Sequence, residues 1–216
     1  MLSKSLSRRR FFGTAGRIRA FVRCSLTLLL SLAVLFGGAT VASAAQEDPI
    51  AEALSRVAND TWTDADLDLI RSDPELAGQV ADPKAPVETG VDASEKEEAT
   101  TSAICGAWVD VWYRKRSLLG STLYVWHHRV VYCRDGARVT RWQNRYDYIT
   151  DSQSVVYVRG LQVNQAGAVP AASSWSHLQR IVELCVVKYG CYSTYKPHSL
   201  ITVRGNGTYT YSGANG

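Results

Sequence analysis

Short runs of alternating apolar and polar residues dominate the second half of this sequence. A period of two is typical of strands with one buried face, and helical periodicity is nearly absent there. Seven stretches show the alternation: 107–113, 122–132, 138–142, 154–163, 177–188, 200–204 and 208–211. Asp135-Gly136 adds a hairpin-turn signal, as does the Gly-Asn-Gly near the end of the chain. The pattern predicts a mainly β domain over 105–216, built as a small antiparallel β-sandwich or barrel.

Four cysteines in this domain predict two disulfides. The alternating stretches on either side of 117–121 form a hairpin centred near Leu119, which places Cys105 opposite Cys133. Cys185 and Cys191 are separated by five residues, which is short enough for a second local bridge. We therefore expect the pairs 105–133 and 185–191 among the three connectivities. A zinc site is the alternative, but the spacings contain no Cys-x-x-Cys pair, so we expect no metal and no cofactor.

The first 45 residues have the layout of an export signal. Seven Lys/Arg and no acid precede the apolar run 26–36, and Ala42-Ser43-Ala44 supplies a cleavage signal of the small-x-small type. Residues 7–12 also resemble a twin-arginine motif, so twin-arginine export and the general secretory route both stay open. We expect cleavage near Ala44 and a secreted, extracellular product. Membrane attachment would occur only through an uncleaved signal.

Acidic and basic residues separate along the rest of the chain. Residues 46–104 hold fifteen Asp/Glu and four Lys/Arg, whereas residues 105–216 hold five Asp/Glu and thirteen Lys/Arg. The segment 46–81 reads as short acidic helices, with Thr63 as an N-cap and Pro74 at a first helical position. The stretch 82–104 is poor in large apolar residues and reads as a disordered linker. We expect 46–81 to act either as a removable pro-region that masks the basic domain or as a retained acidic arm.

Aromatic and basic side chains of the β domain are the candidate binding residues. All four Phe lie in the first 45 residues, so Tyr, Trp and aliphatic residues must build the core. Both faces of the first hairpin carry aromatics, so some of them should be exposed and able to contact a ligand. The candidates are Trp108, Trp112, Arg114, Arg116, Trp126, Arg129 and Arg141. The favoured interpretation is a secreted non-enzymatic binding module for the cell envelope, an anionic polymer or a protein.

Two other functions stay open, although the sequence contains no established catalytic motif. In the first, His127 or His128 combines with Glu183 and Arg129 for general acid–base cleavage of RNA. The protein would then be a secreted toxin-like RNase or other hydrolase masked by the acidic pro-region. In the second, the 117–121 turn is the rigid loop of an extracellular peptidase inhibitor.

The β domain resembles a set of uncharacterised secreted, disulfide-containing β-rich proteins of actinobacteria. The resemblance lies in Cys105-x-x-Trp108, Gly120, Trp126-His127-His128 and Cys133-Arg134-Asp135-Gly136, and the cysteine pair 185/191 fits it. These motifs are structural. The resemblance therefore implies a disulfide-stapled β domain and no particular activity.

Overall fold

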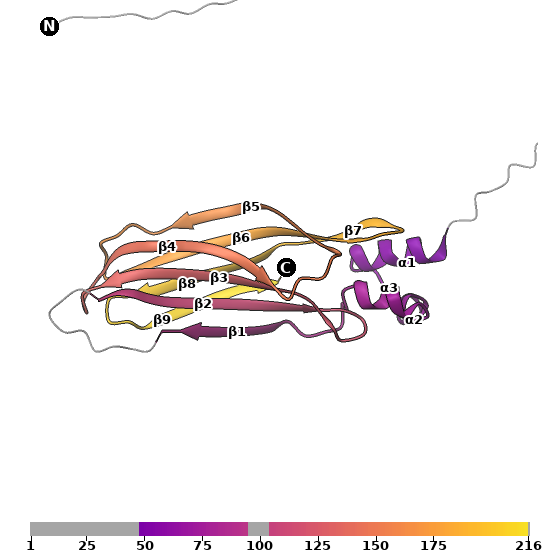
Figure 1. Ribbon diagram of the computed structural model, residues 1–216, viewed down its shortest axis with the longest axis horizontal. Coiled ribbons are helices and arrows are strands. Elements are labelled where there is room, and N and C mark those ends of the chain that lie inside the picture. The colour runs from indigo at the N-terminus through magenta and orange to yellow at the C-terminus, as the bar shows by residue number, and fades with distance from the viewer. Residues whose placement is uncertain (1–47, 95–103, 216) are drawn as a thin grey trace, which may run out of the picture. The chain divides into compact units, whose positions relative to one another are not determined.

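Two antiparallel sheets form the body of the protein in the computed structural model, which describes residues 48–94 and 104–215 (Figure 1). The first sheet has the order β1 (Glu88–Ala93), β2 (Ile104–Arg116), β3 (Thr122–Arg134), β4 (Val139–Thr150). The second has the order β5 (Val156–Ala166), β6 (Ser173–Val186), β8 (Pro197–Arg204), β9 (Tyr209–Asn215), and β7 (Gly190–Tyr195) also pairs with β6. The predicted mainly β architecture is confirmed, as two sheets that enclose a common core.

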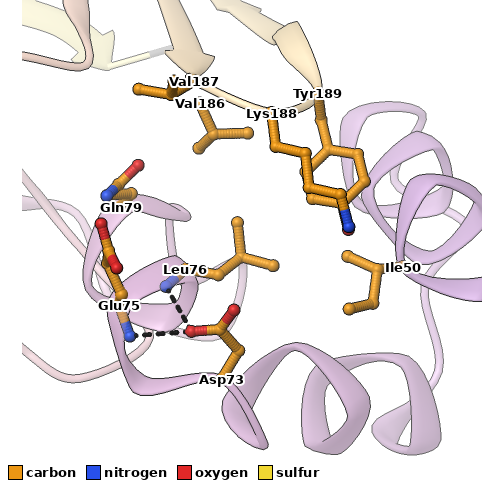
Figure 2. A pocket seen from close by; sticks show the side chains of 9 residues that line it. All are labelled: Ile50, Asp73, Glu75, Leu76, Gln79, Val186, Val187, Lys188 and Tyr189. Atoms are coloured by element: carbon orange, nitrogen blue, oxygen red, sulfur yellow. Dashed lines mark hydrogen bonds between the residues drawn. The ribbon is translucent and has the colours of Figure 1, made fainter.

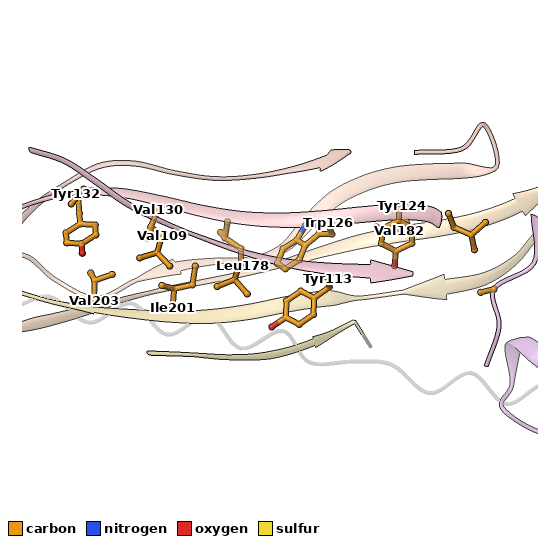
Figure 3. Packing of buried hydrophobic residues seen from close by; sticks show 14 of the residues in the cluster. Val109, Tyr113, Tyr124, Trp126, Val130, Tyr132, Leu178, Val182, Ile201 and Val203 are labelled. Carbon is orange, nitrogen blue, oxygen red and sulfur yellow. The ribbon is translucent and has the colours of Figure 1, made fainter. Parts of the chain in front are cut away.

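The core between the sheets is built without phenylalanine. Tyr113, Tyr124 and Trp126 are its largest fully buried side chains, and the rings of Tyr113 and Trp126 stack with centroids 5.8 Å apart. Leu178 and Ile201 of the second sheet are completely buried in the same cluster (Figure 3). Aromatic rings bury large apolar areas, so these three residues supply much of the volume that the missing Phe would have filled.

Three short helices precede the sheets, as the sequence predicts: α1 (Pro49–Ala58), α2 (Asp64–Arg71) and α3 (Pro74–Gln79). Thr63 caps α2 in a capping box with Asp66, which satisfies backbone N–H groups at the start of the helix. The apolar faces of the helices form a second cluster, which includes Leu118 of the β2–β3 turn and Val186 of β6. Short helices are marginal alone, so this packing against the β domain stabilises them.

The prediction of a disordered linker over 82–104 is wrong for residues 88–93, which form β1 and pair with β2 over six residues. Thr89 and Val91 lie opposite the buried Tyr113 and Val111, whereas Glu88 and Asp92 lie in the alternate register positions. Charged residues are common on edge strands because they discourage further pairing. Here Glu88 and Asp92 gave the stretch the composition of a linker, so the strand was not predicted. Residues 1–47 and 95–103, which include the expected signal segment, lie outside the described residues.

Both predicted disulfides are present. Cys105 and Cys133 face each other across β2 and β3, and Cys185 and Cys191 do so across β6 and β7. Such bonds indicate folding in an oxidising compartment. Among the helices of residues 48–94 and 104–215, none is long and apolar enough to cross a membrane.

Candidate functional site

The candidate site is the solvent-facing side of the first sheet, called the outer face below. Along β2, Val109, Val111 and Tyr113 point into the core, so the residues between them point outward. The strand register aligns these with outward residues of β3 and β4. The outer face comprises Trp108, Asp110, Trp112, Arg114, Arg116, His127, Arg129, Tyr146, Tyr148 and Thr150.

Two tryptophan–arginine pairs lie on the outer face. The Arg129 guanidinium lies 4.0 Å from the centre of the Trp108 ring, and that of Arg114 lies 5.3 Å from the Trp112 ring. Both distances fall within the range of cation–π attraction. The Trp112 ring also covers Gly90 of β1 so closely that a Cβ there would come within 2.1 Å of it. The two indoles are therefore held in fixed positions.

Carboxylates balance the arginines of the outer face. Glu88 accepts a hydrogen bond of 2.9 Å from Arg114 and another from Arg116. These two guanidinium groups hold the Glu88 pKa below its usual value, and Arg116 has the larger effect. Arg129 lies 3.8 Å from the Asp110 carboxylate. The outer face is consequently rich in guanidinium groups and carries little net charge.

Asp110 lies at the centre of this face, although its side chain is only 5% exposed. One carboxylate oxygen accepts a 2.5 Å hydrogen bond from the Tyr148 hydroxyl, and the other lies 3.1 Å from His127 Nδ1. The ring of Tyr148 stacks on that of His127 with centroids 4.4 Å apart and planes within 9°. Burial and the Asp110 carboxylate raise the Tyr148 pKa to about 12, so Tyr148 remains a donor at neutral pH. The opposite nitrogen, His127 Nε2, lies 3.1 Å from Thr150 Oγ1.

Five of the seven predicted binding residues lie on the outer face, and Arg141 lies beside it. The Arg141 guanidinium is 3.7 Å from Cys133 Sγ, over the disulfide that joins β2 and β3. Trp126 was predicted wrongly: it is completely buried and its indole N–H donates to Asp147. The reason is the orientation of β3, which turns Trp126 inward and its neighbour His127 outward.

The residues suggested for RNA cleavage do not converge. His128 is completely buried between the sheets, where its ring nitrogens lie 2.5 Å from Ser199 Oγ and 2.8 Å from Ser176 Oγ. Glu183 lies between two core residues of β6 and therefore points away from the core, where it pairs with Arg159. His127 and Arg129 lie on the other sheet. General acid–base chemistry by this set is ruled out because its members face different surfaces.

The one group of three nearby metal-ligand types in the described ranges is Glu183 with Cys185 and Cys191. The two sulfurs are joined in a disulfide and offer no thiolate to a metal.

The turn suggested as an inhibitory loop is packed in its first half and exposed in its second half. Leu118 is buried against the helices, and its N–H donates to the Val80 carbonyl. Leu119 is the exposed apolar residue of this turn. The first half of the 117–121 turn is therefore anchored against the helices, and residues 119–121 are exposed.

A cavity of about 250 Å³ lies between α1, α3 and the β6–β7 hairpin (Figure 2). Ile50, Leu76 and Val186 give it apolar walls. Asp73 lies at its border, but one of its oxygens accepts the N–H groups of Glu75 and Leu76 and so caps α3. The apolar walls of the cavity could hold a small apolar group.

The second sheet exposes six large apolar side chains (Tyr157, Val158, Leu161, Trp175, Leu200 and Tyr211), whereas the first sheet carries the linked aromatic, arginine and carboxylate contacts described above. The outer face of the first sheet is therefore the surface with the most organised chemistry. No family model and no curated protein matches this chain, and no solved structure matches it either, so the outer face has to be interpreted from its own residues.

Proposed function

We propose that this protein is a secreted binding module that engages another extracellular protein through the outer face of its first sheet. The observation that carries the proposal is the pairing of Trp108 with Arg129 and of Trp112 with Arg114 on one rigid surface. Tyr146, which is 37% exposed, extends this surface onto β4. Trp, Tyr and Arg are the residues most enriched at the energetic centres of protein interfaces.

The charge pattern favours a protein over an anionic polymer. Polyanion binding depends on cations that are free to replace the counterions of the polymer. On the outer face, Glu88 already pairs with Arg114 and Arg116, and Asp110 lies near Arg129. A near-neutral surface of fixed aromatic rings suits a partner that supplies both apolar groups and hydrogen bonds.

The acidic segment has a limited role in this proposal. Several of its acids pair locally: Glu52 and Asp66 with Arg56, and Asp64 with Lys84 of the stretch that follows. Its one described ion pair with the β domain joins Asp48 to Lys188, away from the outer face. We therefore propose that 48–81 stays as a stabilising arm, and that Glu88 of β1 is the acid that neutralises the outer face.

Photo-crosslinking in the native host tests the proposal directly. p-Benzoylphenylalanine replaces Tyr146 on the outer face or, as a matched control, Tyr157, which is 46% exposed on the second sheet. We expect the Tyr146 position to yield a discrete protein adduct that the Tyr157 position does not. Equal labelling at both positions would indicate nonspecific contact and contradict the proposal.

The captured protein is then purified and its affinity is measured by calorimetry. Trp108→Ala and Trp112→Ala should each lower the affinity by about 2 kcal/mol or more, which is roughly 30-fold in Kd, as expected for central interface tryptophans. Chromatography on heparin–agarose distinguishes the polymer alternative. Elution of the protein only well above about 0.15 M salt, with loss of retention in Arg129→Ala, would favour an anionic polymer instead.

A further inference from the structure

Three adjacent strands of the outer face bring together a carboxylate, an imidazole and a hydroxyl in one chain of hydrogen bonds. Asp110 lies on β2, His127 on β3 and Thr150 on β4. Asp110 Oδ1 is 3.1 Å from His127 Nδ1, and His127 Nε2 is 3.1 Å from Thr150 Oγ1. These are the nucleophile–base and base–orienter distances that define an activated hydroxyl.

The surroundings hold each member in place. The second oxygen of Asp110 accepts the Tyr148 hydroxyl, so the carboxylate is fixed and its remaining oxygen faces His127. Stacking on Tyr148 restricts the His127 ring, whose side chain is 15% exposed. The tautomer that satisfies both contacts carries its proton on Nδ1, because a carboxylate accepts that proton and leaves Nε2 free to accept from Thr150.

We propose that Thr150 is a nucleophile for acyl transfer from small carboxylic esters, with His127 as its general base and Asp110 as the residue that orients the base. This inference is independent of whether a protein partner binds the outer face. It shares His127 with the RNase hypothesis but differs from it in the other residues and in the chemistry.

The reaction balances with water as the only co-reactant. Thr150 Oγ1 attacks the ester carbonyl carbon while its proton passes to His127 Nε2. The same proton then passes to the departing alkoxide, which leaves as an alcohol, and the acyl group remains on Thr150 as an ester. A water molecule, deprotonated by His127, then attacks the acyl carbon, and the bond between that carbon and Thr150 Oγ1 breaks to release the carboxylic acid. His127 returns the proton to Thr150 Oγ1 and so restores the hydroxyl. Asp110 holds the His127 ring in place and stabilises the imidazolium that forms in each half-reaction.

The position of Thr150 limits the substrate. Thr150 is exposed at the end of β4. The next residue, Asp151, has a positive φ of 50°. Its N–H is the first backbone donor after Thr150 in the chain. Such an open site cannot enclose a long acyl chain. The fitting substrate class is therefore a short acyl ester that is small or projects from a larger molecule.

Hydrolysis of p-nitrophenyl acetate by the intact, oxidised protein provides the test. We expect a burst of p-nitrophenolate equal to the protein concentration, with one acetyl group mapped to Thr150 by peptide mass spectrometry. Thr150→Val should lower the rate about 100-fold or more, and His127→Gln should do the same, since a positioned base supplies about that factor. Thr150→Ser keeps a hydroxyl and should retain the activity.

Thr210→Val is the matched control, because Thr210 is an exposed strand threonine on β9 of the second sheet. It should leave the rate unchanged. Circular dichroism and the urea midpoint of each variant establish that it is folded. Wild-type hydrolysis no faster than that of an equal concentration of imidazole would overturn the proposal. So would a folded Thr150→Val protein that acetylates and turns over like the wild type.

Discussion

Mild acid should destabilise this fold through a single buried imidazole. His128 is completely buried, with one ring nitrogen 2.5 Å from Ser199 Oγ and the other 2.8 Å from Ser176 Oγ. Burial, followed by the nearby Arg145 cation, lowers the His128 pKa from 6.5 to about 3. The folded protein therefore keeps this side chain neutral at pH values where the unfolded chain binds a proton.

The size of the effect follows from proton linkage. Stability is fully present above about pH 6.5 and falls by roughly 1.4 kcal/mol per pH unit below it. Between about pH 7.5 and about pH 5 the loss should reach roughly 2 kcal/mol. It should continue until the pH falls to about 3, where the folded state also accepts the proton. Glu88 and Asp135 also have lowered pKa values, but they act only below about pH 4.5, so the window from about 5 to 7.5 reports on the imidazole.

Urea unfolding followed by tryptophan fluorescence measures this slope, with the disulfides kept oxidised. His128→Gln retains a neutral side chain that can hydrogen-bond the two serines, so its stability should be nearly flat over the same window. His177→Gln is the control, because His177 lies on the partly exposed side of β6 and its removal should leave the slope intact. A wild-type protein equally stable at both ends of the window would refute the reasoning, and so would an unchanged slope in His128→Gln.

Three further predictions concern packing and cross-links. Gly90→Ala should displace the Trp112 ring and increase hydrogen exchange at the β1 amides while the other strands stay protected, since the new Cβ would lie 2.1 Å from that ring; unchanged β1 protection would contradict it. Leu67→Ala, at a completely buried position of the helical cluster, should lower the unfolding free energy measured in urea by about 2–5 kcal/mol. A loss below about 1 kcal/mol would mean that the helices contribute little to the global fold. Replacing both Cys105 and Cys133 by Ser should lower the unfolding free energy by about 3.6 kcal/mol, and removing the Cys185–Cys191 bond should lower it by about 2.4 kcal/mol. The first loss is larger because the loop closed by Cys105–Cys133 is longer. The reverse order in urea titrations would argue against the loop-entropy explanation.

The sequence predicts the hairpin register well because two signals coincide. The 117–121 turn and the cysteine positions both require Cys105 to pair with Cys133, and the observed register has this pairing. The inward and outward faces were harder to assign. In β3 the core face carries Trp126 and His128, while the outer face carries His127 and Arg129. Alternation alone cannot tell these faces apart, because aromatic and titratable residues occur on both.

The outer-face network was missed for a related reason. The sequence identifies His127 as a candidate base, but only the three-dimensional register brings it within 3.1 Å of Asp110. Thr150 could not be identified as a candidate, because a threonine near the end of an alternating stretch belongs to no sequence motif. The edge strand β1 was hidden by Glu88 and Asp92, whose acidity resembles that of the segment before it.

The order of the strands has a consequence for how the chain acquires its cross-links. Nearly every neighbouring pair in the two sheets joins strands that are consecutive in the chain, and each disulfide closes within one such hairpin. Contacts of this kind need little loop closure and form early. As the polypeptide emerges from its N-terminus, the Cys105–Cys133 bond can close before Cys185 has appeared, so neither Cys185 nor Cys191 competes for these two cysteines. The two pairs should therefore form without exchange between them by a disulfide isomerase.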